Sequence, residues 1–265
     1  MSTAPGGGRE GLTPAYTAVR TRLGLVTALF LVAAVGWVST AHAMQGMDSG
    51  PWSSLGSVGW FLGIWVVMMA AMMLPSVAPT IALYSQLKRA SSPLSPWLFT
   101  SGYLLTWAAA GLLAYGIGRT AHAVLGDLLS WDKSGRNIAG VTLVVAAVYE
   151  LTPLKDVCLG HCRSPLGALL GSWRDGRLGA VRMGMRNGAW CVGCCWALMA
   201  SLFALGVMSL TWMALVAGII AVEKMLPWRG VVTYATAGLL LVLGLFLLVA
   251  PQALPGLTTP SGMTM

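Results

Sequence analysis

The chain has 265 residues, of which 57% are hydrophobic and 9% are charged, and its formal net charge is +8. Soluble domains contain about 25% charged and about 45–50% apolar residues, so this composition excludes an ordinary soluble domain and predicts an integral membrane protein. The positive charge does not indicate nucleic acid, because Lys and Arg collect in the cytoplasmic loops of membrane proteins. We therefore expect the lipid bilayer, and no nucleic acid, as a partner.

Seven apolar runs of about 20 residues predict an all-α fold, a polytopic transmembrane helix bundle. In chain order they cover residues 23–41, 57–84, 96–118, 137–151, 188–208, 209–226 and 230–250. The first run follows Arg20 and Arg22 and ends in the small residues around His42, a pattern that also fits a cleaved secretory signal. Cleavage there would leave six spans.

The positive residues predict how this bundle is oriented. With a cytoplasmic N-terminus, 13 of the 16 Lys and Arg residues fall on the cytoplasmic side, as the positive-inside rule requires. Residues 1–22 are then a disordered cytoplasmic tail and residues 23–250 are the bundle. Residues 155–187 form its largest cytoplasmic loop, and residues 251–265 form a second disordered tail. Both tails are assigned from their Gly, Pro and Thr content.

Two short motifs, CLGHC and CVGCC, flank the cytoplasmic loop and contain all five cysteines. In each motif the candidate ligands stand at spacing i, i+3, i+4: Cys158, His161 and Cys162, then Cys191, Cys194 and Cys195. Residues at that spacing share one face of a helix. The odd count and the reducing compartment argue against structural disulfides. If the two segments approach, thiolates and an imidazole converge on a soft-metal site suited to copper, with zinc as the alternative.

Two other interpretations of the cysteines remain open. In the first, the motifs serve packing alone, because free cysteine is often buried as a small hydrophobic residue. A redox role for Cys191 and Cys194 is the other, although no βαβ pattern of the thioredoxin kind accompanies them.

Methionines add a second sulfur pattern, which suggests a metal relay. Four lie in VVMMAAMMLPS, one lies deep in the cysteine-bearing run, and two stand near a histidine in the outer loop: Met68, Met69, Met72, Met73, Met199, Met44, Met47 and His42. Thioether sulfur binds Cu(I), so these residues would lead copper inward from weaker to stronger ligands. The alternative is that methionine fills irregular gaps between helices.

Two acidic residues, Glu150 and Glu223, lie inside apolar runs near the predicted cytoplasmic boundary. Charge at such depth is rare, and it is either functional or paired. The two carboxylates are candidate metal ligands, bases near the metal, or ion-pair partners of Lys155 and Lys224, and pairing is the favoured role. The chain shows no hydrolase or nucleotide-binding motif and few histidines and carboxylates, so we expect no enzyme.

Four ordered segments carry a family resemblance: MMAAMMLPS, YELTPLKDVCLGHCRSPLG, GAWCVGCCWALM and VEKMLPW. With them, residues 57–250 closely resemble a bacterial family of polytopic proteins described as predicted metal-binding integral membrane proteins, sometimes labelled copper chaperones. The resemblance implies a multi-pass protein of the bacterial inner membrane. It also implies site roles for the five cysteines, for Glu150 and Glu223, and for the group from Met68 to Met73.

The first functional hypothesis is therefore a membrane protein that binds copper and acts in its handling, delivery or uptake, with a membrane copper enzyme or other membrane complex as a possible partner. The second is a non-catalytic structural or assembly subunit of a larger membrane complex. The third is a thiol redox membrane protein.

Overall fold

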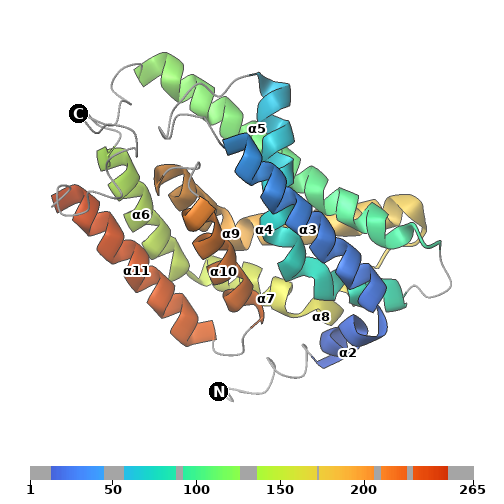
Figure 1. Cartoon of the computed structure of the whole chain (residues 1–265). Helices are drawn as coiled ribbons and strands as arrows, with labels where there is room; N and C mark the ends of the chain where they lie inside the picture. The colour runs from blue at the N-terminus through green and yellow to red at the C-terminus, as the bar shows by residue number, and fades with distance from the viewer. Residues whose placement is uncertain are drawn as a thin grey trace.

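A computed structural model describes residues 13–44, 57–87, 92–125, 136–171, 173–205, 210–225 and 229–249, and these ranges contain helices and no strand. The predicted all-helical fold class is confirmed. The helices are α2 (Thr13–Thr21), α3 (Leu23–Met44), α4 (Val58–Leu87), α5 (Ser95–Leu125), α6 (Arg136–Glu150), α7 (Pro153–Arg163), α8 (Pro165–Leu170), α9 (Gly176–Leu205), α10 (Leu210–Met225) and α11 (Arg229–Val249). Figure 1 shows α3 alongside α4, α11 alongside α6, and the short α7 and α8 at one end of the long helices.

Four of the described helices are long and apolar enough to cross a membrane, and they lie in α3, α4, α5 and α11. A fifth crossing arises if α6 and α7, which meet at a 67° bend, are taken as one broken span. The predicted runs 188–208 and 209–226 fall on α9 and α10, which are not among the helices that meet this requirement over the described residues. The structure thus supports four or five spans of the seven predicted.

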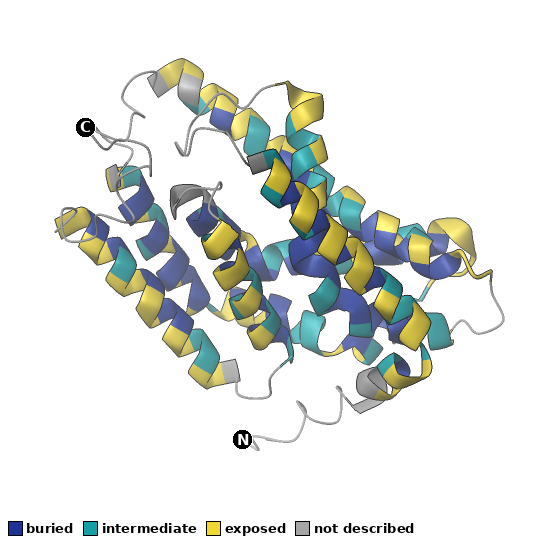
Figure 2. Ribbon diagram, viewed as in Figure 1, coloured by how far each residue is buried: buried dark blue, intermediate teal, exposed yellow. Residues whose placement is uncertain are grey.

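Burial follows the pattern of a bundle surrounded by an apolar medium. The outward faces of α3, α6 and α11 are exposed and their inward faces are buried (Figure 2). Many exposed side chains are large and apolar, among them Val35 on α3, Ile117 on α5 and Val249 on α11. Water penalises such surface, whereas lipid does not, so the exposed faces suit a bilayer.

Part of the predicted N-terminal tail is helical, which corrects the boundary placed at residue 22. Helix α2 packs against the bundle with Ala18 fully buried. Its end is tied to α4, where the Arg22 guanidinium donates a hydrogen bond to the Ser85 carbonyl and the Gln86 amide bonds the Thr21 hydroxyl. Composition alone missed this helix because its stabilising contacts come from α4.

The predicted cytoplasmic loop 155–187 is also mostly helical. Helix α7 begins after Thr152, whose hydroxyl accepts the backbone N–H of Lys155 at 3.4 Å, and Pro153 occupies its first turn. Helix α8 likewise begins at a proline, Pro165, after Ser164. Such Thr-Pro and Ser-Pro pairs are helix-start signals. The bend between α6 and α7 folds this segment back onto α9.

Helices α5 and α9 touch backbone to backbone. A Cβ at Gly184 would lie 2.0 Å from the Phe99 carbonyl oxygen, and a Cβ at Gly102 would lie 2.1 Å from that of Val181. Only glycine permits this separation, because any side chain would push the helices apart. The contact fixes the position of α5 along α9, next to the cysteine-bearing part of α9.

Candidate metal centre

The three cysteines of CVGCC converge on one face of α9. The Cys191, Cys194 and Cys195 sulfur atoms all lie within 4.8 Å of one another, and all three residues are buried. The uninterrupted helix produces this grouping directly, because i, i+3 and i+4 side chains are neighbours. The Cys194 and Cys195 thiols donate to the Cys191 carbonyl at 3.2 and 2.8 Å, which holds their rotamers.

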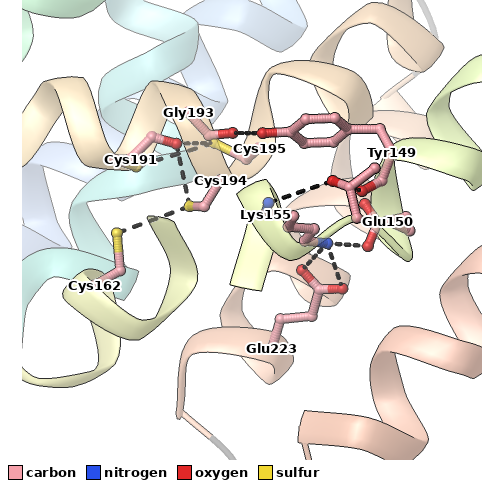
Figure 3. Close-up of polar contacts among 10 residues, drawn as sticks. Tyr149, Glu150, Lys155, Cys162, Cys191, Gly193, Cys194, Cys195 and Glu223 are labelled. Atoms are coloured by element: carbon pink, nitrogen blue, oxygen red, sulfur yellow. Dashed lines mark hydrogen bonds and ion pairs between the residues drawn. The ribbon is translucent and has the colours of Figure 1, made fainter. Parts of the chain in front are cut away.

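Helix α7 adds a fourth sulfur to this group. The Cys162 sulfur lies 3.8 Å from that of Cys194, and the Cys191 and Cys195 sulfurs are 4.0 Å apart (Figure 3). A metal–sulfur bond of about 2.3 Å places two sulfurs of one trigonal or tetrahedral metal site about 4 Å apart. The sulfur spacings therefore fit thiolates that share a small soft ion. Cys162 is half-buried as a residue, whereas Cys191, Cys194 and Cys195 are buried.

Two predicted ligands of the CLGHC motif lie outside the three-cysteine group. The Cys158 sulfur packs against Gly193, where an added Cβ would lie 2.9 Å from it. The His161 ring stacks on Trp190 with centroids 4.0 Å apart, and its Nδ1 lies 3.0 Å from the Val157 carbonyl oxygen. Among the described residues, the group of ligand atoms within 4.8 Å consists of the three α9 cysteines, so neither side chain joins it.

A buried cation and a phenol contact the centre at Cys191. The Lys224 ammonium on α10 donates to the Cys191 sulfur at 3.0 Å, and the Tyr103 hydroxyl on α5 lies 3.0 Å from the same sulfur. Lys224 also bonds the Ser76 hydroxyl on α4 at 3.4 Å. A buried positive charge offsets the negative charge that metal-binding thiolates bring into a low-dielectric interior.

The two predicted intramembrane acids share a single lysine. Lys155 on α7 forms ion pairs with Glu150 at the end of α6 and with Glu223 on α10, the latter at 2.8 Å (Figure 3). All three side chains are buried. Lys224, the other lysine considered as a partner, contacts Cys191 and Ser76 instead. Lys155 on α7 thus joins α6, α7 and α10.

A tyrosine links α6 to the same part of α9. The Tyr149 hydroxyl donates to the Gly193 carbonyl at 2.6 Å, and its ring meets Trp196 edge to face with centroids 4.8 Å apart. Gly193 lies between Cys191 and Cys194, so this bond holds α6 against the CVGCC turn, while the Lys155 ion pairs hold α7 against α6 and α10.

The structure describes some of the residues of the predicted methionine relay. Met68, Met69, Met72 and Met73 are all buried in α4, and Met199 is buried one turn beyond Cys195. The Ser76 hydroxyl donates to the Met73 carbonyl and accepts from Lys224, so the methionine segment of α4 ends one turn before a residue that contacts Lys224. His42 is exposed near the end of α3. The Met44 side chain and Met47 lie outside the described residues, so the outer loop stays a prediction.

Three residues around the centre were not predicted from the sequence: Tyr103 and Lys224, which contact Cys191, and Ser76, which contacts Lys224. Lys224 carried a signal, because a lysine inside an apolar helix needs a partner. Its assignment to a carboxylate was the simpler choice, and only the packing of α10 against α4 and α9 directs it to a thiol.

A family model described as PpoB2, copper chaperone, matches residues 62–247. The chain belongs to this family. The matched range contains the four methionines of α4, both acids and all five cysteines, and it confirms the resemblance seen in the sequence. No curated protein and no solved structure matches the chain. A copper chaperone is a metal-binding role, which fits the three-cysteine cluster.

Proposed function

We propose that this copper chaperone family member binds Cu(I) at a thiolate centre formed by Cys191, Cys194 and Cys195, with Cys162 as the thiol through which the ion enters or leaves. The observation that carries the proposal is the grouping of three buried sulfurs within 4.8 Å, with a fourth 3.8 Å from Cys194. Thiolate exchange between Cys162 and Cys194 would move copper between a half-buried and a buried position.

Copper is preferred to zinc because of the donors nearby. Thiolates bind both metals, but thioethers select Cu(I). The methionines of α4 end one turn before the Lys224 contact, and Met199 lies one turn from Cys195. A delivery role to a membrane copper enzyme follows as part of the proposal, since thiolate exchange needs no nucleotide and the four sulfurs offer more than one coordination state.

Metal content tests the centre. Protein purified anaerobically with reductant should contain about one copper per chain, and the variant with Cys191, Cys194 and Cys195 changed to Ser should contain none, as measured by mass spectrometry. Serine removes the soft donor at nearly constant volume, so the fold should persist, which circular dichroism checks. The Cys158→Ser variant is the matched control and should keep its copper, because its sulfur lies against Gly193.

Other metal results would change the assignment. Stoichiometric zinc in the native chain would make the centre a zinc site. Absence of metal from the native protein after Cu(I) is supplied would contradict metal binding, and the structural-subunit hypothesis would replace it. Loss of copper in Cys158→Ser would enlarge the ligand set to include α7's first cysteine.

We also propose a multi-pass protein of the bacterial inner membrane, with a cytoplasmic N-terminus and the thiols near the cytoplasmic side. His42 and Arg177 are exposed and fall on opposite predicted sides. A membrane-impermeant maleimide applied to whole cells should label His42→Cys and leave Arg177→Cys unlabelled, and both should react after permeabilisation. The reverse pattern would contradict the orientation, and labelling of neither in whole cells would contradict an outer position for His42.

A further inference from the structure

A cavity of about 450 Å³ lies between α7, α8 and α9, next to the sulfur cluster but separate from it. Small residues form part of its wall: Gly160, Gly167, Ala168 and Gly171. Polar and aromatic side chains form another part: Asp156, His161, Arg186, Asn187 and Trp190. Cavities of about 300–1,000 Å³ with a few placed polar groups are typical of small-molecule sites.

The cavity and the metal centre share one helix contact. His161 on α7 stacks on Trp190 on α9, and each is followed in the chain by a thiol of the centre, Cys162 and Cys191. Successive residues of a helix point about 100° apart, so the ring pair faces the cavity while the following thiols turn toward the sulfur cluster. Only the width of this α7–α9 contact separates the cavity from Cys162.

The cavity wall carries charges of both signs, Asp156 and Arg186, so it is suited to a carboxylate on its Arg186 side. The Arg186 guanidinium and the Asn187 amide stand one after the other at the cavity, and the His161 ring adds a third polar group. A guanidinium binds carboxylates through paired, charge-assisted hydrogen bonds, which an amide group supplements. The stacked rings supply an apolar surface for the remainder of such a molecule.

We propose that this cavity binds a small thiol compound with a carboxylate, as the soluble carrier from which Cu(I) passes to Cys162. This inference rests on the proposed function, because Cu(I) is soft and thiolates are its preferred ligands in a reducing compartment. Arg186 and Asn187 hold the carboxylate, and the carrier's sulfur lies toward Cys162 at the α7–α9 contact.

The transfer is a ligand exchange without a redox change. Copper enters and leaves the step as Cu(I). Its bond to the carrier sulfur breaks as a bond to the Cys162 sulfur forms, and the proton displaced from the Cys162 thiol passes to the released carrier thiolate. The 3.8 Å gap to Cys194 then allows the same exchange to continue inward.

Binding of the carrier is tested on the full chain in lipid nanodiscs, freed of metal, by calorimetric titration. The probes are glutathione and its S-methyl derivative, which keeps the carboxylates but cannot bind copper through a thiolate. Both should bind saturably. Arg186→Gln should weaken binding about tenfold, the loss of one charge-assisted contact worth about 1.4 kcal/mol. Arg182→Gln, an exposed arginine one turn away on the same helix and outside the cavity lining, should bind normally.

A filled cavity provides a second variant. A Cβ at Gly160 meets open space within 4 Å, so Gly160→Leu should extend into the cavity without a backbone clash and abolish binding. Gly218→Leu on α10, where a Cβ also meets open space, is the control for adding leucine to a helix. Equal binding by the Gly160→Leu and native proteins, or no saturable binding by the native protein, would overturn the inference.

Copper transfer separates this inference from the proposed function. In stopped-flow experiments, Gly160→Leu should take up Cu(I) from its glutathione complex at least about tenfold more slowly than the native protein, with the same final copper content. An unchanged rate would remove the carrier role while the metal centre stood. Failure of the native chain to bind copper would instead contradict the proposed function.

Discussion

Changing Lys155 to Met should be the most destabilising single substitution near the metal centre. It would leave the Glu150 and Glu223 carboxylates buried beside each other without their shared cation. Removing one partner of a buried ion pair costs about 3–5 kcal/mol, because the remaining charge has no compensation. We expect a large fall in the unfolding midpoint, measured in mixed detergent micelles, together with loss of helical signal at lower denaturant.

A compensated variant distinguishes this electrostatic cause from lost packing. Lys155→Met combined with Glu150→Gln and Glu223→Gln removes all three charges, and replacing a complete buried ionic group is often nearly neutral. The triple variant should therefore recover most of the lost stability. If it unfolded as readily as Lys155→Met alone, the stem of Lys155 and not its charge would be the stabilising element.

The same substitution should affect the proposed copper centre through α7. Lys155 lies two turns before Cys162 on that helix, and its ion pairs hold α7 against α6 and α10. Tyr149 would still tie α6 to Gly193, so the α9 cysteines should keep their grouping. We expect Lys155→Met to slow copper exchange through Cys162 more than it lowers the final copper content.

Local patterns made the α9 part of the centre predictable. Three cysteines at i, i+3 and i+4 share a face in any helix, so their grouping follows from the helix alone. The approach of Cys162 to Cys194 was predicted conditionally, because it required the CLGHC and CVGCC segments to meet. The position of His161 outside the sulfur cluster was not predicted, because it depends on the stacking of its ring on Trp190, a tertiary contact.

The segment 155–187 shows why sequence reasoning missed helices α7 and α8. Its many Lys and Arg residues match a cytoplasmic loop, and α8 has only six residues, which is too short for a periodic signal. The Thr152-Pro153 and Ser164-Pro165 pairs were the available indications of helix starts. The pairing of Lys155 with Glu223, 68 residues away, depends on how α7 and α10 pack.

Gly184→Ala should be the most destabilising of the substitutions that add a side chain to a glycine in the bundle. The new Cβ would meet the Phe99 carbonyl oxygen at 2.0 Å, and backbone atoms cannot move aside as a flexible side chain can. Overpacking of this kind costs about 1–3 kcal/mol and occasionally more, so we expect at least about 3 kcal/mol for a clash with backbone. Gly116→Ala on α5, where a Cβ meets open space, should be neutral or slightly stabilising through its helix propensity.

The consequence for the metal centre makes this prediction more specific than a loss of stability. Separation of α5 from α9 would draw the Tyr103 hydroxyl away from the Cys191 sulfur, while Lys224 on α10 would keep its contact. Gly184→Ala should therefore weaken copper binding in a competition titration, and Tyr103→Phe should reproduce that weakening without lowering the unfolding midpoint as far. If Gly184→Ala lowered stability but left copper affinity unchanged, the Tyr103 phenol would contribute nothing to holding the Cys191 thiolate. The α5–α9 contact would then support the fold and not the metal centre.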